Sequence, residues 1–440
     1  MDLLLRGGTV VAMDAARSVR RADVLIRNGE IAAIGKRAAL ARPVHVLDAR
    51  GAAVIPGLVQ AHVHLCQALF RGMADDLPLL EWLKQRIWPL EAAHDDKSMR
   101  ASALLGLAEM IRAGTTTILD MGTVHHQDAV FRAMRDAGIR GLSGKAMMDR
   151  GTGVPKGLRE STRASLRESE RLYDRWHGAE EGRLGYAFAP RFILSCSEKL
   201  LRSVGEIASD RDAIVHSHAA EHPDERAAVR AALGRDDVDA LADWGIAGPR
   251  TVLAHGVQLT AAQMRRAGRS GTRFVHCPSA NLKLSSGIAR VTKMREAGIV
   301  VGLGSDGAPC NNRMDLWTEL RQAAILAKVR EGDAAALPAE EAFALATIDG
   351  ARVLGLEDRI GSVEVGKRAD LAVVDLEGLH AEPGGDIVAR LVYSATASDV
   401  RHVLIDGRVV VKRGELTELD ADLIRRDARR HGRRVLDAIS

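Results

Sequence analysis

The sequence predicts an α/β protein: a (β/α)8 barrel of the TIM type with a small β-sandwich formed by both termini. Two observations support this fold class. From residue 57 to residue 360, short apolar runs alternate with helical patterns, as in parallel strands joined by crossover helices. Residues 1–56 and 361–440 instead hold short strands and turns, followed by a polar amphipathic helix at the end of the chain. The 440 residues suffice for one barrel and one smaller unit.

The two terminal segments carry hairpin signals. Asn28-Gly29 lies between two short apolar runs near the N-terminus, and Asp406-Gly407 lies between two others near the C-terminus. These dipeptides favour two-residue turns because both residues tolerate positive φ. We therefore expect residues 1–56 and 361–440 to form one β-rich unit, with residues 57–360 as the barrel between them.

Eight candidate barrel strands follow one another in the middle of the chain. They are residues 54–65, 115–121, 142–148, 184–192, 213–219, 251–257, 273–278 and 299–306. A doubly wound open sheet is the structural alternative, but no Gly-x-Gly-x-x-Gly motif follows the first strand. Active sites of barrels form at the C-terminal ends of the strands, so polar residues at those ends are the candidates for function.

Composition excludes several classes of protein. The 62 basic and 58 acidic residues leave a net charge of only +4, and no basic stripe with interleaved aromatic residues is visible, so a nucleic-acid partner is not expected. The four cysteines form no Cys-x-x-Cys pair, which argues against a disulfide framework. No apolar run reaches about 18 residues and no signal-peptide pattern is present, so we expect a cytoplasmic protein without a membrane partner.

The first predicted barrel strand ends in His62-x-His64. Side chains two residues apart on a strand point to the same face, so these imidazoles form half of a divalent-metal site. Three other predicted strands end in groups of the same kind. These are His216, His218 and Glu221 after the fifth strand, His255 at the sixth and Asp306 at the eighth. The shared position of these residues at strand ends predicts a metal site.

This set resembles the amidohydrolase superfamily, and within it the deaminase branch, over residues 3–415. The most specific motifs are Pro56-Gly57 through His62-x-His64, His218-x-x-Glu221, Ala254-His255, Asn281-Leu282-Lys283-Leu284 and Ser305-Asp306-Gly307. The resemblance implies a barrel inserted in a β-sandwich and one metal ion per subunit, Zn²⁺ with Fe²⁺ as the alternative. The implied metal ligands are His62, His64, His218 and Asp306.

The resemblance also implies a hydrolytic deamination. Asp306 would take a proton from the attacking water, His255 would orient the hydroxide, and Glu221 would protonate the ring nitrogen of the substrate. Relatives with two metals carry a bridging carboxylated lysine on the fourth strand. Residues 184–192 contain no lysine, and Lys145 belongs to the third strand, so a mononuclear site is implied. We interpret His216, one layer deeper than His218, as a packing or supporting residue.

The implied substrate-binding residues are Gln67, Glu91, Arg191 and Glu221. The loop after the first strand resembles deaminases of S-adenosylhomocysteine, methylthioadenosine and 5′-deoxyadenosine, in which the acid matching Glu91 holds the ribose hydroxyls. Arg191 and Gln67 instead resemble guanine deaminase, in which the arginine faces the purine carbonyl. Arg191 as a structural ion-pair residue remains an open alternative.

Residues 150–160 contain no reliable counterpart of an arginine that binds a carboxylate tail, which favours a neutral nucleoside. An adenosine-type nucleoside is therefore the predicted small-molecule partner. Guanine deaminase and s-triazine hydrolase are the alternative activities, because they use the same scaffold. A non-catalytic scaffold is the alternative from another class, and a homo-oligomer is left open.

Overall fold

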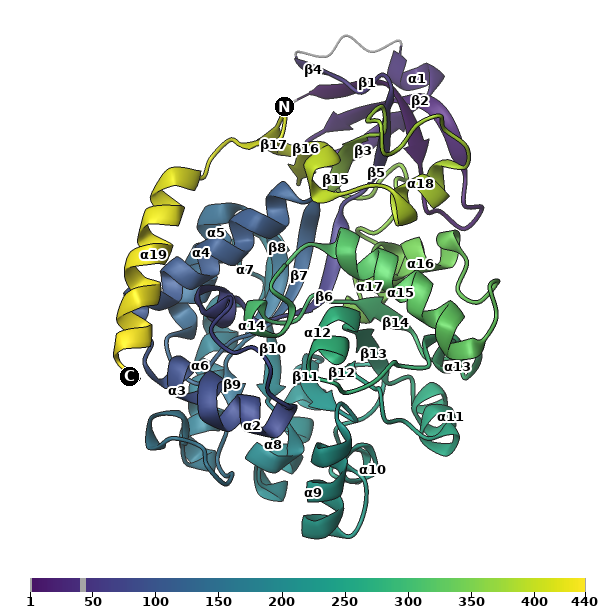
Figure 1. The fold of residues 1–440 in the computed structure, drawn as a ribbon. Helices are drawn as coiled ribbons and strands as arrows, with labels where there is room; N and C mark the ends of the chain where they lie inside the picture. The colour runs from purple at the N-terminus through teal and green to yellow at the C-terminus, as the bar shows by residue number, and fades with distance from the viewer. Residues whose placement is uncertain (1, 40–44, 440) are drawn as a thin grey trace.

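The computed structural model describes residues 2–39 and 45–439 (Figure 1). Within these residues, parallel strands follow one another in the order β6, β7, β8, β10, β11, β12, β13 and β14, and β9 pairs with β10. Their bounds are β6 (Leu58–Val63), β7 (Thr115–Met121), β8 (Arg140–Gly144), β9 (Ala146–Met147), β10 (Leu184–Pro190), β11 (Ile214–Ala219), β12 (Thr251–His255), β13 (Arg273–His276) and β14 (Val301–Leu303). The predicted (β/α)8 barrel is confirmed.

The barrel closes between its first and last strands. The N–H of Asp306 donates to the carbonyl oxygen of His62 at 3.2 Å, and Val63 forms a parallel bridge with Asp306. Gly304 permits this approach, since a Cβ there would lie 2.5 Å from the same carbonyl oxygen. The closing seam therefore brings together two residues that the sequence analysis assigned to the metal site.

Helices surround the barrel strands on the outside. They include α4 (Asp96–Arg112), α5 (Gln127–Ala137), α6 (Thr162–Trp176), α8 (Glu198–Asp210), α9 (Pro223–Leu233), α10 (Asp237–Asp243), α11 (Ala261–Ser270), α13 (Val291–Glu296), α15 (Leu316–Glu331), α16 (Ala339–Leu345) and α17 (Ile348–Leu354). Every residue of β6 and β7 is buried. Burial on both faces explains why these strands show no regular alternation of apolar and polar residues.

Both ends of the chain build a second sheet at one end of the barrel (Figure 1). Its strands are β1 (Leu3–Val11), β2 (Val19–Arg27), β3 (Glu30–Ile34), β4 (His45–Asp48), β5 (Ala52–Pro56), β15 (Leu371–Asp375), β16 (Val400–Ile405), β17 (Arg408–Lys412) and β18 (Glu415–Leu416). The antiparallel pair β5–β15 joins the N-terminal strands to the C-terminal ones. Asn28-Gly29 and Asp406-Gly407 both turn with positive φ at each residue, as their sequence predicted.

Two predicted strands are each divided in the structure. Residues 54–65 contribute to β5 in the terminal sheet and to β6 in the barrel, with Gly57 between them, so the prediction of one strand was wrong. Residues 142–148 likewise divide into β8 and β9 at the buried Lys145. A continuous apolar run carries no period that marks where one strand stops and the next begins. The predicted domain limits at residues 56 and 360 stay a prediction.

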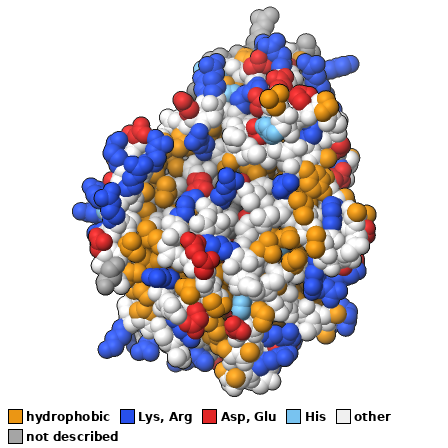
Figure 2. All heavy atoms as spheres, in the orientation of Figure 1, with side chains coloured by type: hydrophobic (Ala, Val, Ile, Leu, Met, Phe, Trp, Pro, Cys, Tyr) orange, Lys and Arg blue, Asp and Glu red, His pale blue; other side chains and the backbone are white. Residues whose placement is uncertain are grey.

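The C-terminal helix α19 (Ala421–Asp437) packs along α4. Its buried face includes Ile424 and Val435, whereas basic side chains gather over the exposed face (Figure 2). Arg434 reaches Asp95, the N-cap residue of α4, at 2.9 Å. This confirms the amphipathic helix that the sequence predicted. No helix of the described residues is long and apolar enough to cross a membrane.

A buried ion cluster fastens the barrel to the second sheet. Arg140, at the start of β8, pairs with Asp370 at 2.6 Å and with Asp406, and the side chains of Arg140 and Asp370 are 3% and 1% exposed. Asp370 also accepts from the N–H of Asp406 at 2.8 Å. Removal of one partner from such a cluster leaves an unpaired buried charge.

We predict that Asp370→Ala lowers the free energy of unfolding by about 3–5 kcal/mol, because Arg140 loses the more buried of its two carboxylate partners and the N–H of Asp406 loses its acceptor. Chemical denaturation monitored by circular dichroism measures this. The control is Glu296→Ala, which breaks an exposed pair with Lys293 and should cost less than about 1 kcal/mol. Equal effects of the two substitutions would contradict the assigned role of the cluster.

Candidate active site

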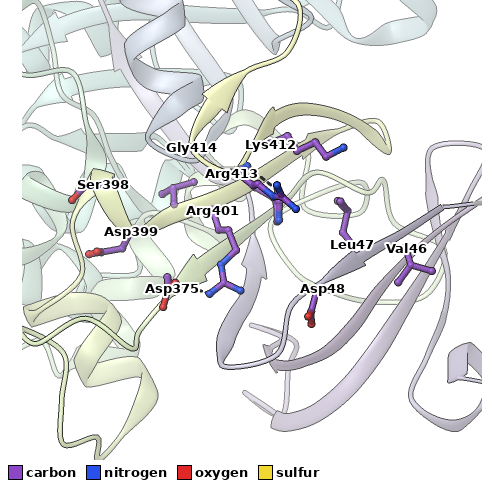
Figure 3. Close-up of a pocket in the computed structure, with 12 residues that line it drawn as sticks. Val46, Leu47, Asp48, Asp375, Ser398, Asp399, Arg401, Lys412, Arg413 and Gly414 are labelled. Atoms are coloured by element: carbon purple, nitrogen blue, oxygen red, sulfur yellow. Dashed lines mark hydrogen bonds and ion pairs between the residues drawn. The ribbon is translucent and has the colours of Figure 1, made fainter.

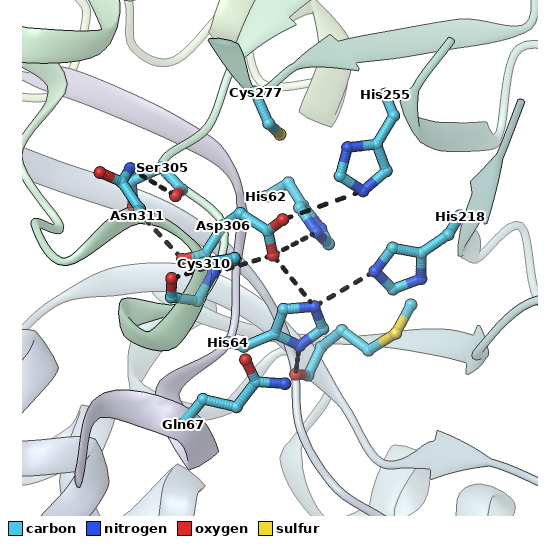
Figure 4. A network of polar contacts seen from close by, with 12 residues as sticks. His62, His64, Gln67, His218, His255, Cys277, Ser305, Asp306, Cys310 and Asn311 are labelled. Carbon is cyan, nitrogen blue, oxygen red and sulfur yellow. Dashed lines mark hydrogen bonds and ion pairs between the residues drawn. The ribbon is translucent and has the colours of Figure 1, made fainter. Parts of the chain in front are cut away.

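The residues predicted for the metal site meet at the C-terminal mouth of the barrel (Figure 4). His62 and His64 come from the end of β6, His218 from β11, His255 from β12, and Asp306 from the segment after β14. Barrel enzymes carry their active sites at this end. The side chains that the sequence analysis assigned to separate strand ends therefore lie together at one place.

Ligand atoms of these side chains converge. His64 Nε2 lies 3.2 Å from His218 Nε2, and Asp306 Oδ1 lies 3.4 Å from both His62 Nε2 and His64 Nε2. The ligand atoms of His62, His64 and His218 all lie within 4.8 Å of one another, as do those of His62, His255 and Asp306. Three imidazoles and one carboxylate at this spacing suit a single divalent metal ion.

Hydrogen bonds at Nδ1 fix the orientation of two of these imidazole rings, those of His64 and His218. Nδ1 of His64 donates to the carbonyl oxygen of Met121, and Nδ1 of His218 donates to that of Arg191, each at 2.7 Å. A carbonyl oxygen only accepts, so Nδ1 carries the proton and Nε2 of the neutral ring presents a lone pair. Two facing lone pairs 3.2 Å apart repel each other unless a cation lies between them. The arrangement thus fits a bound metal ion.

His216 supports the third imidazole. Its Nε2 lies 2.9 Å from Nδ1 of His62, and the residue is completely buried on β11. His62 Nε2 makes no hydrogen bond within the described protein, so it faces the shared point without a partner. His216 therefore contacts Nδ1 of His62 in the way that the carbonyl oxygens of Met121 and Arg191 contact Nδ1 of His64 and His218.

Burial sets the protonation state of the cluster. It lowers the pKa of His64 to about 3, with a further contribution from His62, lowers the pKa of His218 well below its usual value and lowers that of His255 to about 3. Burial opposes ionisation of Asp306, but the neighbouring histidines outweigh it and hold the pKa of this carboxyl well below its usual value. Neutral imidazoles and an ionised carboxylate are the forms that bind metals.

Glu221 lies beside the cluster in the opposite protonation state. Burial, followed by the charges of Glu225 and Asp306, raises the pKa of the Glu221 carboxyl well above its usual value. Its Oε2 lies 3.4 Å from Nε2 of His255. Asn281 Nδ2 donates to His255 Nδ1 at 2.9 Å, which leaves the ring proton on Nε2, toward Glu221 and Asp306. A protonated carboxyl and an N–H group therefore face the same space.

The backbone at these strand ends is strained. Ala220, His255 and Asp306 have φ values of 53°, 80° and 60°, in the left-handed region that side chains with a Cβ seldom adopt. Such residues gather at functional sites, where the surrounding contacts hold them. On β7, Asp120 accepts from the N–H of Leu65 at 2.8 Å and so holds the residue that follows His64.

The predicted substrate residues form a buried network. Arg191 pairs with Glu91 through two bonds, Nη1 to Oε2 at 2.5 Å and Nη2 to Oε1 at 3.1 Å, and Gln67 Nε2 donates to Glu91 Oε1 at 2.9 Å. The structure thus shows the ion-pair alternative for Arg191. The side chain of Glu91 is fully buried, and the free group of the network is Gln67 Oε1, which makes no hydrogen bond.

A small pocket opens above the cluster. Its polar lining residues are His64, Gln67, Arg191, His218, Glu221, His255 and Asp306, and its apolar ones are Leu79, Trp82, Leu83, Phe192 and Leu284. A lining that combines apolar side chains, two of them aromatic, with hydrogen-bonding groups suits an aromatic ring that carries polar substituents. The indole N–H of Trp82 is buried without a partner.

A larger cavity lies on the second sheet, away from the barrel mouth (Figure 3). Charged residues of both signs line it. Arg401 pairs with Asp375 at 2.5 Å, and Asp48 pairs with Arg50. The groups of described residues able to hold a metal ion both lie at the barrel mouth. The chemistry of the molecule is therefore concentrated there.

Sequence reasoning missed three contributors to the site. Asn281 lay in a quoted motif without a role, and neither Trp82 nor Phe192 was named as a candidate. Aromatic residues in loops that follow barrel strands were the available signal for Trp82 and Phe192. The hydrogen bond of Asn281 joins residues 26 positions apart and had no signal in the sequence.

Fold and site together define a metal-dependent hydrolase of the barrel type. Residues 53–410 match the Amidohydrolase family. The chain is 40% identical over 428 residues to a 5-methylthioadenosine/S-adenosylhomocysteine deaminase of Halobacterium salinarum, covering 97% of this chain and 96% of the relative. It is 38% identical over 405 residues to a 5′-deoxyadenosine deaminase of Methanothermobacter thermautotrophicus, covering 92% of each.

Among solved structures, an adenosine deaminase from Xanthomonas campestris with bound zinc superposes with a TM-score of 0.93 at 34% identity, covering 99% of each chain. The chain belongs to the amidohydrolase family.

We predict that His216→Phe, which keeps a ring but removes the hydrogen bond to His62, weakens zinc binding by about 10–100-fold. Competition with a chromophoric chelator measures the affinity. The matched control is His276→Phe, a buried histidine at the end of β13 that is outside both candidate ligand groups and should leave zinc affinity unchanged. Unchanged affinity in His216→Phe would show that His216 only fills space.

Proposed function

We propose that this chain is a mononuclear, metal-dependent hydrolytic deaminase that releases ammonia from an adenosine-type nucleoside such as 5′-deoxyadenosine, methylthioadenosine or S-adenosylhomocysteine. It is a hydrolase that acts on carbon–nitrogen bonds. One observation carries the proposal: histidine lone pairs and a carboxylate converge beside Glu221, a buried carboxyl whose pKa is raised well above its usual value by burial and by the charges of Glu225 and Asp306. The deaminase names of relatives that match almost the whole chain support it.

His62, His64, His218 and Asp306 would hold the metal, with Zn²⁺ proposed and Fe²⁺ as the alternative. When bound, a divalent metal supplies a Lewis acid that lowers the pKa of water toward about 7. No cysteine belongs to the candidate ligand groups of the described residues. The ligand set therefore combines neutral nitrogen donors with a single anionic oxygen, a combination that Zn²⁺ and Fe²⁺ both accept.

The protein residues would then divide the proton transfers. Asp306 accepts the proton of the attacking water, and the N–H of His255 donates to the oxygen that gains negative charge. Glu221 gives its proton to the ring nitrogen next to the attacked carbon. The proton held by Asp306 then passes to the amino nitrogen with the help of Glu221, and the carbon–nitrogen bond breaks with release of ammonia. The hydroxyl proton of the tetrahedral carbon passes to Glu221 as the carbonyl forms, which restores both carboxyl groups to their starting states.

The Arg191–Glu91 pair favours an adenosine derivative over guanine. A guanidinium that already makes two bonds to a buried carboxylate is less available to a purine carbonyl. The free oxygen of Gln67 instead accepts, and so suits an N–H or O–H of the substrate. The aromatic side chains of Trp82 and Phe192, which both line the pocket, suit contact with a purine ring.

The same proposal includes a cytoplasmic location and a role in purine metabolism. All four cysteines are buried and free, which fits a reducing compartment. The s-triazine hydrolase activity remains the alternative, because small changes in a pocket of this fold alter its substrate.

We predict that metal-replete protein deaminates an adenosine derivative with a higher kcat/KM than guanine or a chlorotriazine. A coupled ammonia assay on 5′-deoxyadenosine, methylthioadenosine, S-adenosylhomocysteine, adenosine, guanine and atrazine measures this. A clear preference for guanine would sink the adenosine assignment and return Arg191 to the purine carbonyl. Metal-loaded protein that is inert toward every substrate would favour the scaffold alternative.

We predict that Glu221→Gln keeps one metal per chain and lowers kcat by about 10²–10⁴-fold, because the amide cannot shuttle a proton. Metal analysis and the ammonia assay are made on the same sample. Glu206→Gln, at an exposed position of α8, serves as the control and should behave as wild type. Near-normal turnover in Glu221→Gln would refute the proton-transfer role.

A further inference from the structure

Hydrogen bonds from two other segments of the chain hold the turn that carries Glu221. Ala220 has a φ of 53°, and its peptide is bound on both sides. Its N–H donates to Asp237 Oδ2 at 2.6 Å, and its carbonyl oxygen accepts from the N–H of Gln258 at 2.8 Å. An alanine adopts this backbone only where its surroundings impose it. The direction in which Glu221 leaves β11 therefore depends on these contacts.

Two buried carboxylates bind consecutive N–H groups of this turn. Glu225, in the first turn of α9, accepts from the N–H of Glu221 at 3.1 Å, and Asp237, the first residue of α10, accepts from Ala220. Asp237 Oδ1 also accepts from the N–H of Val238 at 2.8 Å. Glu225 and Asp237 are 1% and 2% exposed. Two helix starts thus present acceptors to the backbone on which Glu221 is mounted.

Glu225 and Asp237 differ from the adjacent Asp236 in their charged partners. Neither Glu225 nor Asp237 forms an ion pair with a lysine or arginine of the described chain, and burial, followed by the charge of Asp237, raises the pKa of Glu225 to about 8. Asp236, one residue earlier, pairs with Arg226 and Arg230 at 2.8 and 2.6 Å. Asp236 therefore fastens α9 to α10, whereas Glu225 and Asp237 face the turn.

We infer that Glu225 and Asp237 are positioning residues for the deamination: they hold the turn so that the Glu221 carboxyl stays 3.4 Å from His255. They act through the backbone of Ala220 and Glu221. The inference rests on the proposed function, because it assigns a catalytic consequence to the place of Glu221. It adds two residues that lie beneath the pocket and are not among its lining residues.

Glu225→Leu removes the acceptor, and Glu225→Gln keeps one. The inference expects Glu225→Leu to lower kcat by about 10–100-fold with one zinc still bound and with KM changed less than kcat. Glu225→Gln should restore kcat to within about threefold of wild type, because its amide oxygen still accepts from the N–H of Glu221. If Glu225→Leu does not fold, Asp237→Ala, which removes the acceptor of the Ala220 N–H, carries the same test.

A double-mutant cycle separates positioning from a general loss of structure. In the Glu221→Gln background, the carboxyl that a positioning residue would orient is already absent. Glu225→Leu should therefore lower kcat by less than about twofold further in that background. The adjacent aspartates supply a matched pair of variants. Asp237→Ala should lower kcat, whereas Asp236→Ala should lower the melting temperature and leave kcat within about twofold of wild type.

Hydrogen exchange tests the turn without reference to activity. Faster exchange of the amides of Ala220 and Glu221 in Glu225→Leu, but not in Asp236→Ala, supports the inference. Wild-type exchange rates or wild-type kcat in Glu225→Leu would overturn it, as would loss of zinc in proportion to kcat or full additivity with Glu221→Gln. Wild-type protein that deaminates no purine would refute the proposed function instead, while the exchange rates still report on the turn.

Discussion

The candidate metal site depends on the hydrogen bonds that fix the orientation of its imidazole rings. Nδ1 of His64 and Nδ1 of His218 each donate to a carbonyl oxygen, of Met121 at the end of β7 and of Arg191 just after β10. The bonds turn both Nε2 lone pairs toward one point, 3.2 Å apart. Two facing lone pairs at this distance repel each other without a cation, so the arrangement fits a bound metal ion. Neighbouring strands supply the carbonyls, which makes the site a property of the strand order.

The same constraint connects the metal site to the closure of the barrel. The hydrogen bond from the N–H of Asp306 to the carbonyl oxygen of His62 joins the last strand to the first, and the side chains of both residues face the metal position. A fault in closure would therefore displace two candidate ligands at once. The turn that carries Glu221 has a different support, because the carboxyl groups of Glu225 and Asp237 accept hydrogen bonds from its backbone. The candidate metal ligands and the turn of Glu221 are thus held by separate sets of contacts.

The sequence predicted the barrel, the shared terminal unit and the residues at the strand ends, because periodicity and position at a strand end are local features. It did not show that Glu91 and Arg191, 100 residues apart, would pair with each other; an ion pair was left open for Arg191 without a named partner, beside the predicted contacts of both residues to substrate. Pairing of this kind depends on where loops place side chains, which no local pattern encodes. The role of Asn281 and the division of residues 54–65 between two sheets were hidden for the same reason.

The most direct test of this account is the X-ray absorption spectrum of the zinc-loaded protein at the zinc edge. The account predicts one zinc per chain with nitrogen and oxygen neighbours at about 2.0–2.2 Å, three of them imidazoles, as the geometry of His62, His64, His218 and Asp306 requires. Sulfur neighbours at about 2.3 Å, or a second metal at about 3.5–4 Å, would contradict it.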